Sequence, residues 1–189
     1  MEAKKITDSK WLNLWEATFT TKLGKIGKWM FASRRQTPEC IGGKRKADAV
    51  VIAAIVDGKD IPGTFKKEGE FICVTKEFRV PLNGYEIGIP AGLIDGDEPV
   101  ETAAGRELHE ETGLIVKEVL NVSPRIYSCG GMSDESVIMV MVKAEGFLTT
   151  ENMEASENIR PFLMDRAAVA MMLEAGVDED GNPLLIGAK

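Results

Sequence analysis

A continuous apolar run, AVVIAAIV at residues 49–56, constrains the fold of this chain most strongly. The run is rich in β-branched residues and shows no alternation of apolar and polar positions, which is typical of a strand buried on both faces. Such a strand needs a covering layer on each side. The run therefore predicts a layered fold around a central sheet.

The segments around this strand predict a mixed α/β fold. The segment PVETAAGRELHEETG predicts a helix, because Pro99 suits a first turn and Gly113 suits the position just after a helix end. A second, amphipathic helix is expected at 165–175. Further strands are predicted at 11–20, 28–33, 71–80, 85–92, 115–122, 125–128, 136–144 and 159–164. Strands on both sides of one helix, with a second helix near the end, indicate a mixed sheet sandwiched by helices.

A polar segment at 36–47, QTPECIGGKRKA, is typical of a linker. We therefore expect an antiparallel β arm over residues 1–47 and a larger domain over residues 48–189. The first 48 residues hold 11 Lys and Arg against 5 Asp and Glu, whereas the whole chain has a net charge of −7. A basic arm on an acidic body could attract an anionic ligand to a cation-loaded site, and a solvated basic face is the alternative.

The composition argues against several classes of protein. No apolar run approaches the roughly 20 residues of a membrane helix, so we expect no membrane partner. The net charge of −7 disfavours binding to polymeric nucleic acid. Three widely spaced cysteines without a CxxC pair argue against a disulfide scaffold and a zinc site. Together with an N-terminal segment that has no apolar stretch, they lead us to expect a cytoplasmic protein.

Acidic residues are concentrated at 92–114, GLIDGDEPVETAAGRELHEETGL. On the expected helix, Glu107 and Glu111 are one turn apart and Glu110 lies beside both. Like charges at this spacing destabilise a bare helix, and Gly105 in its interior adds to the cost. A divalent cation, which prefers oxygen ligands, would neutralise the cluster. An acidic, solvated helix is the alternative.

These residues match the Nudix box, Gly-x5-Glu-x7-Arg-Glu-U-x-Glu-Glu-x-Gly-U, in which U is aliphatic. The matching residues are Gly92, Glu98, Arg106, Glu107, Leu108, Glu110, Glu111, Gly113 and Leu114. The chain therefore resembles the Nudix hydrolases. The resemblance implies a Nudix-type α/β/α sandwich and hydrolysis of a nucleoside diphosphate linked to another group, with Mg²⁺ or Mn²⁺.

The resemblance also implies which residues carry the chemistry. Glu107 and Glu111 would be the chief metal ligands. Glu110 would be a further ligand, directly or through water, and the backbone carbonyl of Ala91 would complete the set.

Other box residues would have structural roles by the same resemblance. Arg106 would pair with Glu98 or Glu110 and hold the loop, helix and loop in shape. Gly92 and Gly113 would likewise be structural.

Outside the box, the segments KWLNLWEATF, GKWMFASR, DAVVIAAI and EFRVPLNGYEIGIPAGLID resemble the ADP-ribose and ADP-sugar pyrophosphatase branch of the family. That resemblance implies a homodimer whose arm contributes to the partner's adenine site. Trp11 and Trp29 occupy the positions of two aromatics that sandwich adenine. Arg34 and Arg79 fall where phosphate- and ribose-contacting arginines lie. A core role is the alternative for the tryptophans, and Trp15 could replace Trp11.

Two features of the later chain bear on mechanism and specificity. The resemblance places a general base at Glu157, just before the last expected strand, with Glu154 as the competing choice and a solvated loop acid as the alternative. Cys129 stands in a Gly-rich turn where the branch usually has Pro, which weakens the case for ADP-ribose itself.

We therefore expect a Mg²⁺-dependent pyrophosphatase that converts ADP-ribose, or a related nucleoside diphosphate sugar, into AMP and a sugar phosphate. The nearest alternative is the same chemistry on GDP-mannose or ADP-glucose. A Nudix domain that senses ADP-ribose without cleaving it is less favoured, because every glutamate of the box is present.

Overall fold

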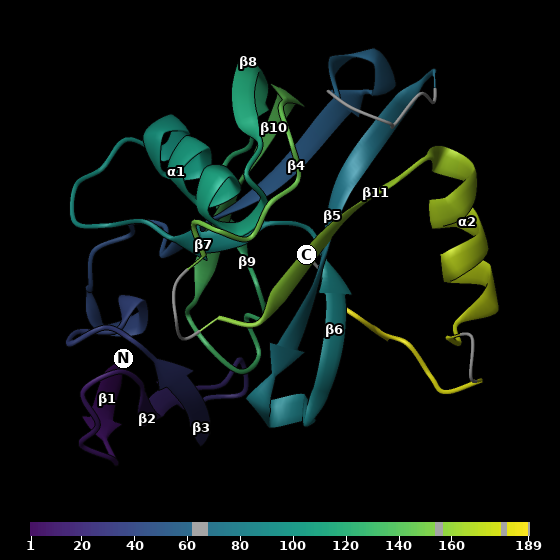
Figure 1. The fold of residues 1–189 in the computed structure, drawn as a ribbon. Coiled ribbons are helices and arrows are strands. Elements are labelled where there is room, and N and C mark those ends of the chain that lie inside the picture. The colour runs from purple at the N-terminus through teal and green to yellow at the C-terminus, as the bar shows by residue number, and fades with distance from the viewer. Residues whose placement is uncertain (62–67, 154–156, 179–180, 189) are drawn as a thin grey trace. The chain divides into compact units, whose positions relative to one another are not determined.

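The structure is a computed structural model of the 189-residue chain and describes residues 1–61, 68–153, 157–178 and 181–188. Its contacts group the chain into two units (Figure 1). The smaller unit combines residues 1–48 with 125–137, and the larger unit combines residues 49–124 with 138–189.

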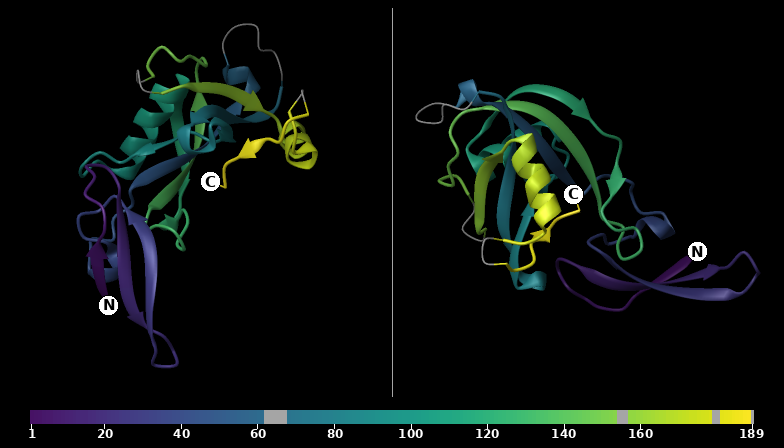
Figure 2. Two further views of the ribbon diagram at one scale, coloured as in Figure 1. Left: turned by 90° about the horizontal axis from the view of Figure 1, so that it is seen from below. Right: turned by 90° about the vertical axis from the view of Figure 1, so that its right-hand side faces the viewer.

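The smaller unit is built on an antiparallel sheet, whose long hairpin is seen in both views of Figure 2. Its strands are β1 (Glu2–Lys5), β2 (Asn13–Thr20) and β3 (Ile26–Ser33). In the β2–β3 register, Trp15 faces Phe31 and Ala17 faces Trp29. Trp15 and Ala17 are buried on one face of β2, whereas Trp11, which was expected on the same strand, precedes β2 and is exposed.

The segment 125–137 is hydrogen-bonded to residues of the first 48. Glu39 lies in the short helix η1 (Glu39–Ile41) and accepts hydrogen bonds from Arg125 and from the Tyr127 hydroxyl. Tyr127 belongs to β9 (Ile126–Tyr127). The Trp29 indole N–H donates to the backbone oxygen of Gly131 at 3.0 Å. These bonds explain why residues 125–137 group with the arm.

The second sheet is mixed, because β12 pairs with β6 in parallel while β5 and β6 are antiparallel. Its strand order is β12 (Leu185–Ile186), β6 (Gly84–Gly88), β5 (Glu70–Arg79), β4 (Ala49–Asp57), β10 (Ser136–Glu145) and β8 (Ile115–Val122). In addition, β11 (Ile159–Met164) pairs with β5, β7 (Ala91–Leu93) pairs with β4, and β9 pairs with β10. Short helices η2 (Gly58–Asp60) and η3 (Val80–Leu82) follow β4 and β5.

Two helices pack on this sheet. The views in Figure 1 and Figure 2 place α1 (Val100–Thr112) and α2 (Arg166–Ala175) on opposite sides of β5 and β11. Val50 and Ile52 of β4 are fully buried, and so is Leu108 of α1. The fold class predicted from the buried run is therefore confirmed.

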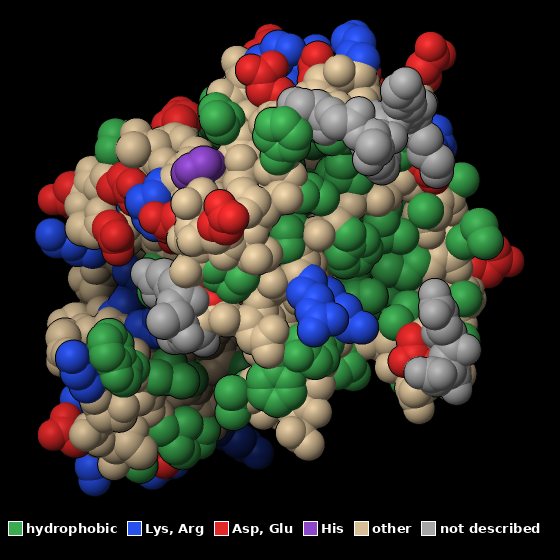
Figure 3. Space-filling view, in the orientation of Figure 1, with side chains coloured by type: hydrophobic (Ala, Val, Ile, Leu, Met, Phe, Trp, Pro, Cys, Tyr) green, Lys and Arg blue, Asp and Glu red, His purple; other side chains and the backbone are tan. Residues whose placement is uncertain are grey.

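Hydrophobic side chains gather beside α2 (Figure 3). They border a groove of about 570 Å³ that Phe71, Leu120 and Val169 help to line. Within the described ranges, no helix is both long enough and apolar enough to cross a bilayer.

Candidate active site

Helix α1 carries the acidic box residues and is bounded by two residues that suit its ends. Pro99 precedes it with an extended backbone, and Gly113 ends it with a φ of 76°. A Cβ at Gly113 would lie 2.4 Å from the Thr149 Cγ2 atom, so a side chain would also clash there. The residues that the sequence predicts for the helix start and end therefore occupy those positions.

The helical period turns Glu107 and Glu111 toward the sheet, where they are 8% and 3% exposed. Burial raises the pKa of Glu111 to about 8, although the Ala91 N–H donates to its Oε2 atom at 3.2 Å and opposes the shift. The negative charges of Glu157, Glu107 and Glu77 raise this pKa further. Burial also raises the pKa of Glu107. Two desolvated carboxylates that repel each other would be stabilised by a cation.

The backbone of β7 touches both glutamates. A Cβ on Gly92 would lie 1.9 Å from the carboxyl carbon of Glu107, so only glycine fits at this position. The backbone N–H of Ala91 donates a hydrogen bond to the Glu111 carboxylate. The predicted ligand group, the Ala91 carbonyl, belongs to the same residue, and its bonding to a cation stays a prediction.

Arg106 holds three acids of the box together. Its Nη1 atom donates to Glu107 at 2.9 Å and to Glu110 at 3.0 Å, and its Nε and Nη2 atoms donate to Glu98 at 3.2 and 3.1 Å. A further bond from Nη2 reaches the Leu93 backbone oxygen at 3.0 Å. The sequence left open whether Glu98 or Glu110 is the partner, and the structure pairs Arg106 with both. The hydrogen bonds from Arg106 lower the pKa of Glu98.

The outward side of α1 differs from its buried side. Glu110 is partly exposed, and His109 is exposed with its Nε2 atom 3.2 Å from the Asn152 amide nitrogen. Acidic side chains gather over this part of the larger unit (Figure 3). Charge alone therefore does not distinguish Glu107 and Glu111 from their neighbours, whereas burial does.

Two acids outside the box act electrostatically on the buried pair. Glu157 is half-buried just before β11, and its charge raises the pKa values of Glu77, Glu107 and Glu111. Glu154, the competing choice for a base, lies outside the described residues. Sequence reasoning did not identify Glu77. Its position two residues before Arg79 on one strand was the available signal, because alternate residues of a strand share a face.

Arg79 is held by two carboxylates. Its Nη1 atom donates to Glu77 at 2.5 Å and its Nε atom donates to Glu86 at 2.9 Å. The Arg79 side chain is 43% exposed, against 21% for Glu77 and 27% for Glu86. The guanidinium is therefore anchored at two atoms and still accessible.

The donor set fits a hard divalent cation in its chemistry. Glu107 and Glu111 offer carboxylate oxygens that are withdrawn from water and repel each other. Arg106 already occupies one oxygen of Glu107, so a cation would share that carboxylate. Within the described ranges, no three Asp, Glu, His or Cys side chains form a ready-made metal cluster.

Three of the residues predicted to contact the substrate, Trp11, Trp29 and Arg34, lie in the smaller unit, whereas Arg79 belongs to the larger unit. Trp11 is 69% exposed with the Lys10 ammonium 4.3 Å from its ring centroid, and Trp29 is 53% exposed. Trp15, the competing aromatic, is 6% exposed and therefore unavailable for stacking within this unit. Arg34 is exposed, and its Nε atom lies 3.6 Å from Glu135.

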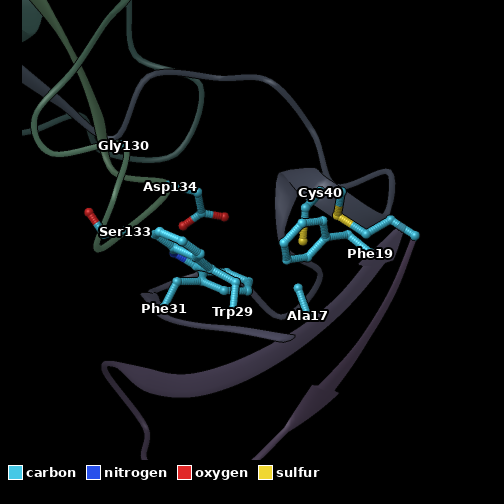
Figure 4. A pocket seen from close by; sticks show the side chains of 9 residues that line it. Ala17, Phe19, Trp29, Phe31, Cys40, Gly130, Ser133 and Asp134 are labelled. Atoms are coloured by element: carbon cyan, nitrogen blue, oxygen red, sulfur yellow. The ribbon is translucent and has the colours of Figure 1, made fainter. Parts of the chain in front are cut away.

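A pocket of about 410 Å³ opens beside Trp29 (Figure 4). Phe19, Trp29 and Phe31 form the aromatic wall of the pocket. The Asp134 carboxylate lies near the rings of Trp29 and Phe31. The pocket thus combines aromatic faces with the polar side chains of Ser133 and Asp134.

Comparison with known proteins identifies the class that this fold and box define. The chain matches the NUDIX domain family over residues 49–182, and it belongs to that family. The resemblance inferred from the box is therefore confirmed.

Two curated relatives align with most of the chain. The ADP-ribose pyrophosphatase of Saccharomyces cerevisiae is 32% identical over 158 residues, which are 84% of this chain and 60% of the relative. The ADP-sugar pyrophosphatase of Mus musculus is 31% identical over 157 residues, which are 82% of this chain and 62% of the relative. The chain thus spans about 60% of the length of these relatives.

A solved structure shares the fold. The crystal structure of an ADP compounds hydrolase matches with a TM-score of 0.65 at 16% identity, and it covers 95% of this chain and 83% of that chain. At this identity the likeness shows the fold alone.

Proposed function

We propose that this protein is a divalent-cation-dependent pyrophosphatase that hydrolyses ADP-ribose or a related nucleoside diphosphate sugar. The observation that carries the proposal is the buried pair of Glu107 and Glu111 on one face of α1, against a glycine backbone that leaves no room for a side chain. Keeping two ionisable groups out of water costs stability, and a bound cation would offset that cost. The names of the aligned relatives, ADP-ribose pyrophosphatase and ADP-sugar pyrophosphatase, support the substrate class.

Mg²⁺, or alternatively Mn²⁺, is the proposed cofactor. Glu107 and Glu111 would hold it, with Glu110 and the Ala91 carbonyl as additional ligands. Gly92, Glu98, Arg106 and Gly113 would maintain the shape of the site. When bound, the metal would neutralise the diphosphate and lower the pKa of the attacking water.

Glu157 is the proposed general base. In the reaction, the water oxygen bonds to one phosphorus while the bond from that phosphorus to the bridging oxygen breaks. Glu157 takes the proton of the water, and the products from ADP-ribose are AMP and ribose 5-phosphate. The half-buried position of Glu157 and the effect of its charge on Glu107 and Glu111 support this role.

The arm, residues 1–47, is proposed to bind the base and to form a homodimer. Trp11 and Trp29 are exposed, and stacking of a base on an aromatic face contributes about 1–3 kcal/mol. Arg34 and Arg79 would contact the phosphates or the ribose. The arm also carries an excess of cations, which suits an anionic ligand.

The cellular setting is proposed from the thiols. Cys40, Cys73 and Cys129 are all free, as expected in a reducing compartment, which favours the cytoplasm.

A panel of ADP-ribose, ADP-glucose and GDP-mannose tests the proposal, with Mg²⁺ or with EDTA, scored by release of AMP or GMP. We expect metal-dependent AMP release that is fastest from ADP-ribose or a close ADP-sugar. Faster GMP release would move the substrate to the guanine series. Binding of ADP-ribose without product under every metal condition would indicate a sensor instead.

A further inference from the structure

Glu77 and Glu86 form an unfavourable pair in the sheet unless a cation separates them. They are directly opposite each other in the β5–β6 register, and opposite positions in adjacent strands project from the same face. Like charges at such positions destabilise a sheet. The Arg79 guanidinium bonds to both carboxylates and neutralises this repulsion.

The bonding pattern leaves one part of the guanidinium open. Arg79 uses its Nε atom for Glu86 and one N–H of Nη1 for Glu77. Among the described residues, no partner is found for the two N–H groups of Nη2 or for the second N–H of Nη1. These adjacent donors match the oxygens of a phosphate group, which guanidinium groups bind in a bidentate manner.

The face of the sheet links Arg79 to the buried acids. Glu77 and Arg79 are alternate residues of β5 and therefore share a face. Cys73 lies on the same face of β5 and packs in one core cluster with Ala104 and Leu108 of α1, so this face is the one that meets the box helix. A phosphate bound by Arg79 would therefore lie on the same side of β5 as the buried glutamates.

We propose that Glu77 and Glu86 are positioning residues, which orient the Arg79 guanidinium so that its remaining N–H donors bind a phosphate of the substrate. This inference rests on the proposed function and goes beyond it, because it assigns a role in diphosphate binding to two acids outside the box. Without Arg79, the two carboxylates would repel a bound phosphate. Their contribution to binding is to restrict the Arg79 side chain, which would otherwise populate many rotamers.

The test is a double-mutant cycle on Arg79 and Glu86, read as binding of a non-hydrolysable α,β-methylene analogue of ADP-ribose by calorimetry with Mg²⁺. Arg79→Ala should weaken binding by about tenfold or more, the loss expected for a hydrogen bond to a charged group. Glu86→Ala should weaken binding several-fold, whereas Glu86→Gln, which keeps the acceptor oxygen, should stay within about twofold of the wild type. The double variant should bind as weakly as Arg79→Ala alone.

A matched control is Glu118→Ala, which breaks an exposed ion pair with Lys143 and should not change binding. Unchanged binding in Glu86→Ala, or fully additive losses in the double variant, would overturn the inference. If Glu86→Ala fails to fold, Glu77→Ala replaces it in the cycle with the same expected non-additivity.

Hydrolysis of ADP-ribose by the wild type separates the two claims. A non-additive binding cycle in a protein that releases no AMP would overturn the proposed function and leave the positioning role standing. An active enzyme with an additive cycle would overturn the positioning role alone. A wild type that does not bind the analogue would overturn both.

Discussion

The buried acids of α1 and the exposed aromatics of the arm are both unfavourable in an isolated chain, but for opposite reasons. Glu107 and Glu111 are ionisable groups withdrawn from water, whereas Trp11 and Trp29 are apolar groups left in it. The first arrangement suits a cation and the second suits a flat apolar ligand or another protein surface. We propose from this difference that the acids act mainly on the rate of the reaction and the aromatics mainly on substrate binding.

Replacement of the proposed base gives the largest effect that separates rate from binding. Glu157→Gln should lower kcat by about 10²–10⁴-fold and leave KM nearly unchanged, because a general base acts mainly in the transition state. Steady-state kinetics with ADP-ribose measures both, and Glu151→Gln, an exposed acid on the same segment, serves as the control. If Glu154→Gln caused this loss and Glu157→Gln did not, the base would be Glu154.

Removal of an aromatic side chain from the arm should have the opposite effect, a higher KM with kcat nearly unchanged. Trp29→Ala should raise KM for an adenine substrate by about 5- to 100-fold, the value of one base stack, and change kcat by less than about twofold. Trp29→Phe should recover part of the loss, and Met30→Ala, an exposed neighbour on the other face of β3, should change neither constant. A Trp29→Ala enzyme that loses turnover with unchanged KM would contradict this division between rate and binding.

The pH dependence of stability reports on the raised pKa values of the buried acids. Glu111 has an ordinary pKa of 4.5 and a pKa of about 8 in the fold, so the folded chain binds more protons than the unfolded chain between these values. The free energy of unfolding of the metal-free protein should therefore fall as the pH rises from about 4.5 to about 8.

Thermal unfolding in EDTA across this pH range measures the decline. Glu111→Gln should make this decline shallower, because it removes the buried carboxyl whose pKa is raised to about 8. An identical slope in the variant would assign the pH dependence to other groups. Trp29→Ala should leave the slope as it is in the wild type.

The smallest effect concerns a glycine that the site does not use. A Cβ at Gly105 would come no closer than 4.0 Å to Val116, so Gly105→Ala should stabilise α1 by about 0.5–1 kcal/mol. For a chain of this size that is about 1–4 °C in Tm, measured by calorimetry, with kcat unchanged. Gly92→Ala is the contrast and should lose activity, because its Cβ would displace the Glu107 carboxyl. An active Gly92→Ala enzyme would show that Glu107 can move away without loss.

The helix and its acids could be predicted because their geometry is local. The spacing of Glu107 and Glu111 fixes one helix face, and the ends of α1 follow from Pro99 and Gly113. The apolar run of β4 similarly required a layer on each side.

Other features depend on contacts between distant segments and could not be predicted from local pattern. β1 is polar and was not foreseen, since its pairing with β2 supplies its structure. The Glu77–Arg79–Glu86 group depends on the register of β5 and β6, and the bonding of residues 125–137 to the arm depends on Glu39. The sequence alone fixes neither the register of β5 and β6 nor the bonding between residues 125–137 and the arm.

The central claim is that the buried pair on α1 binds the metal that makes hydrolysis possible. The direct measurement compares AMP release from ADP-ribose with Mg²⁺ by the wild type, Glu111→Gln and Glu101→Gln, the last removing one exposed acid from the same helix. We predict that Glu111→Gln stays folded and loses turnover by orders of magnitude, while Glu101→Gln keeps it. Near-normal Mg²⁺-dependent hydrolysis by Glu111→Gln would contradict the account.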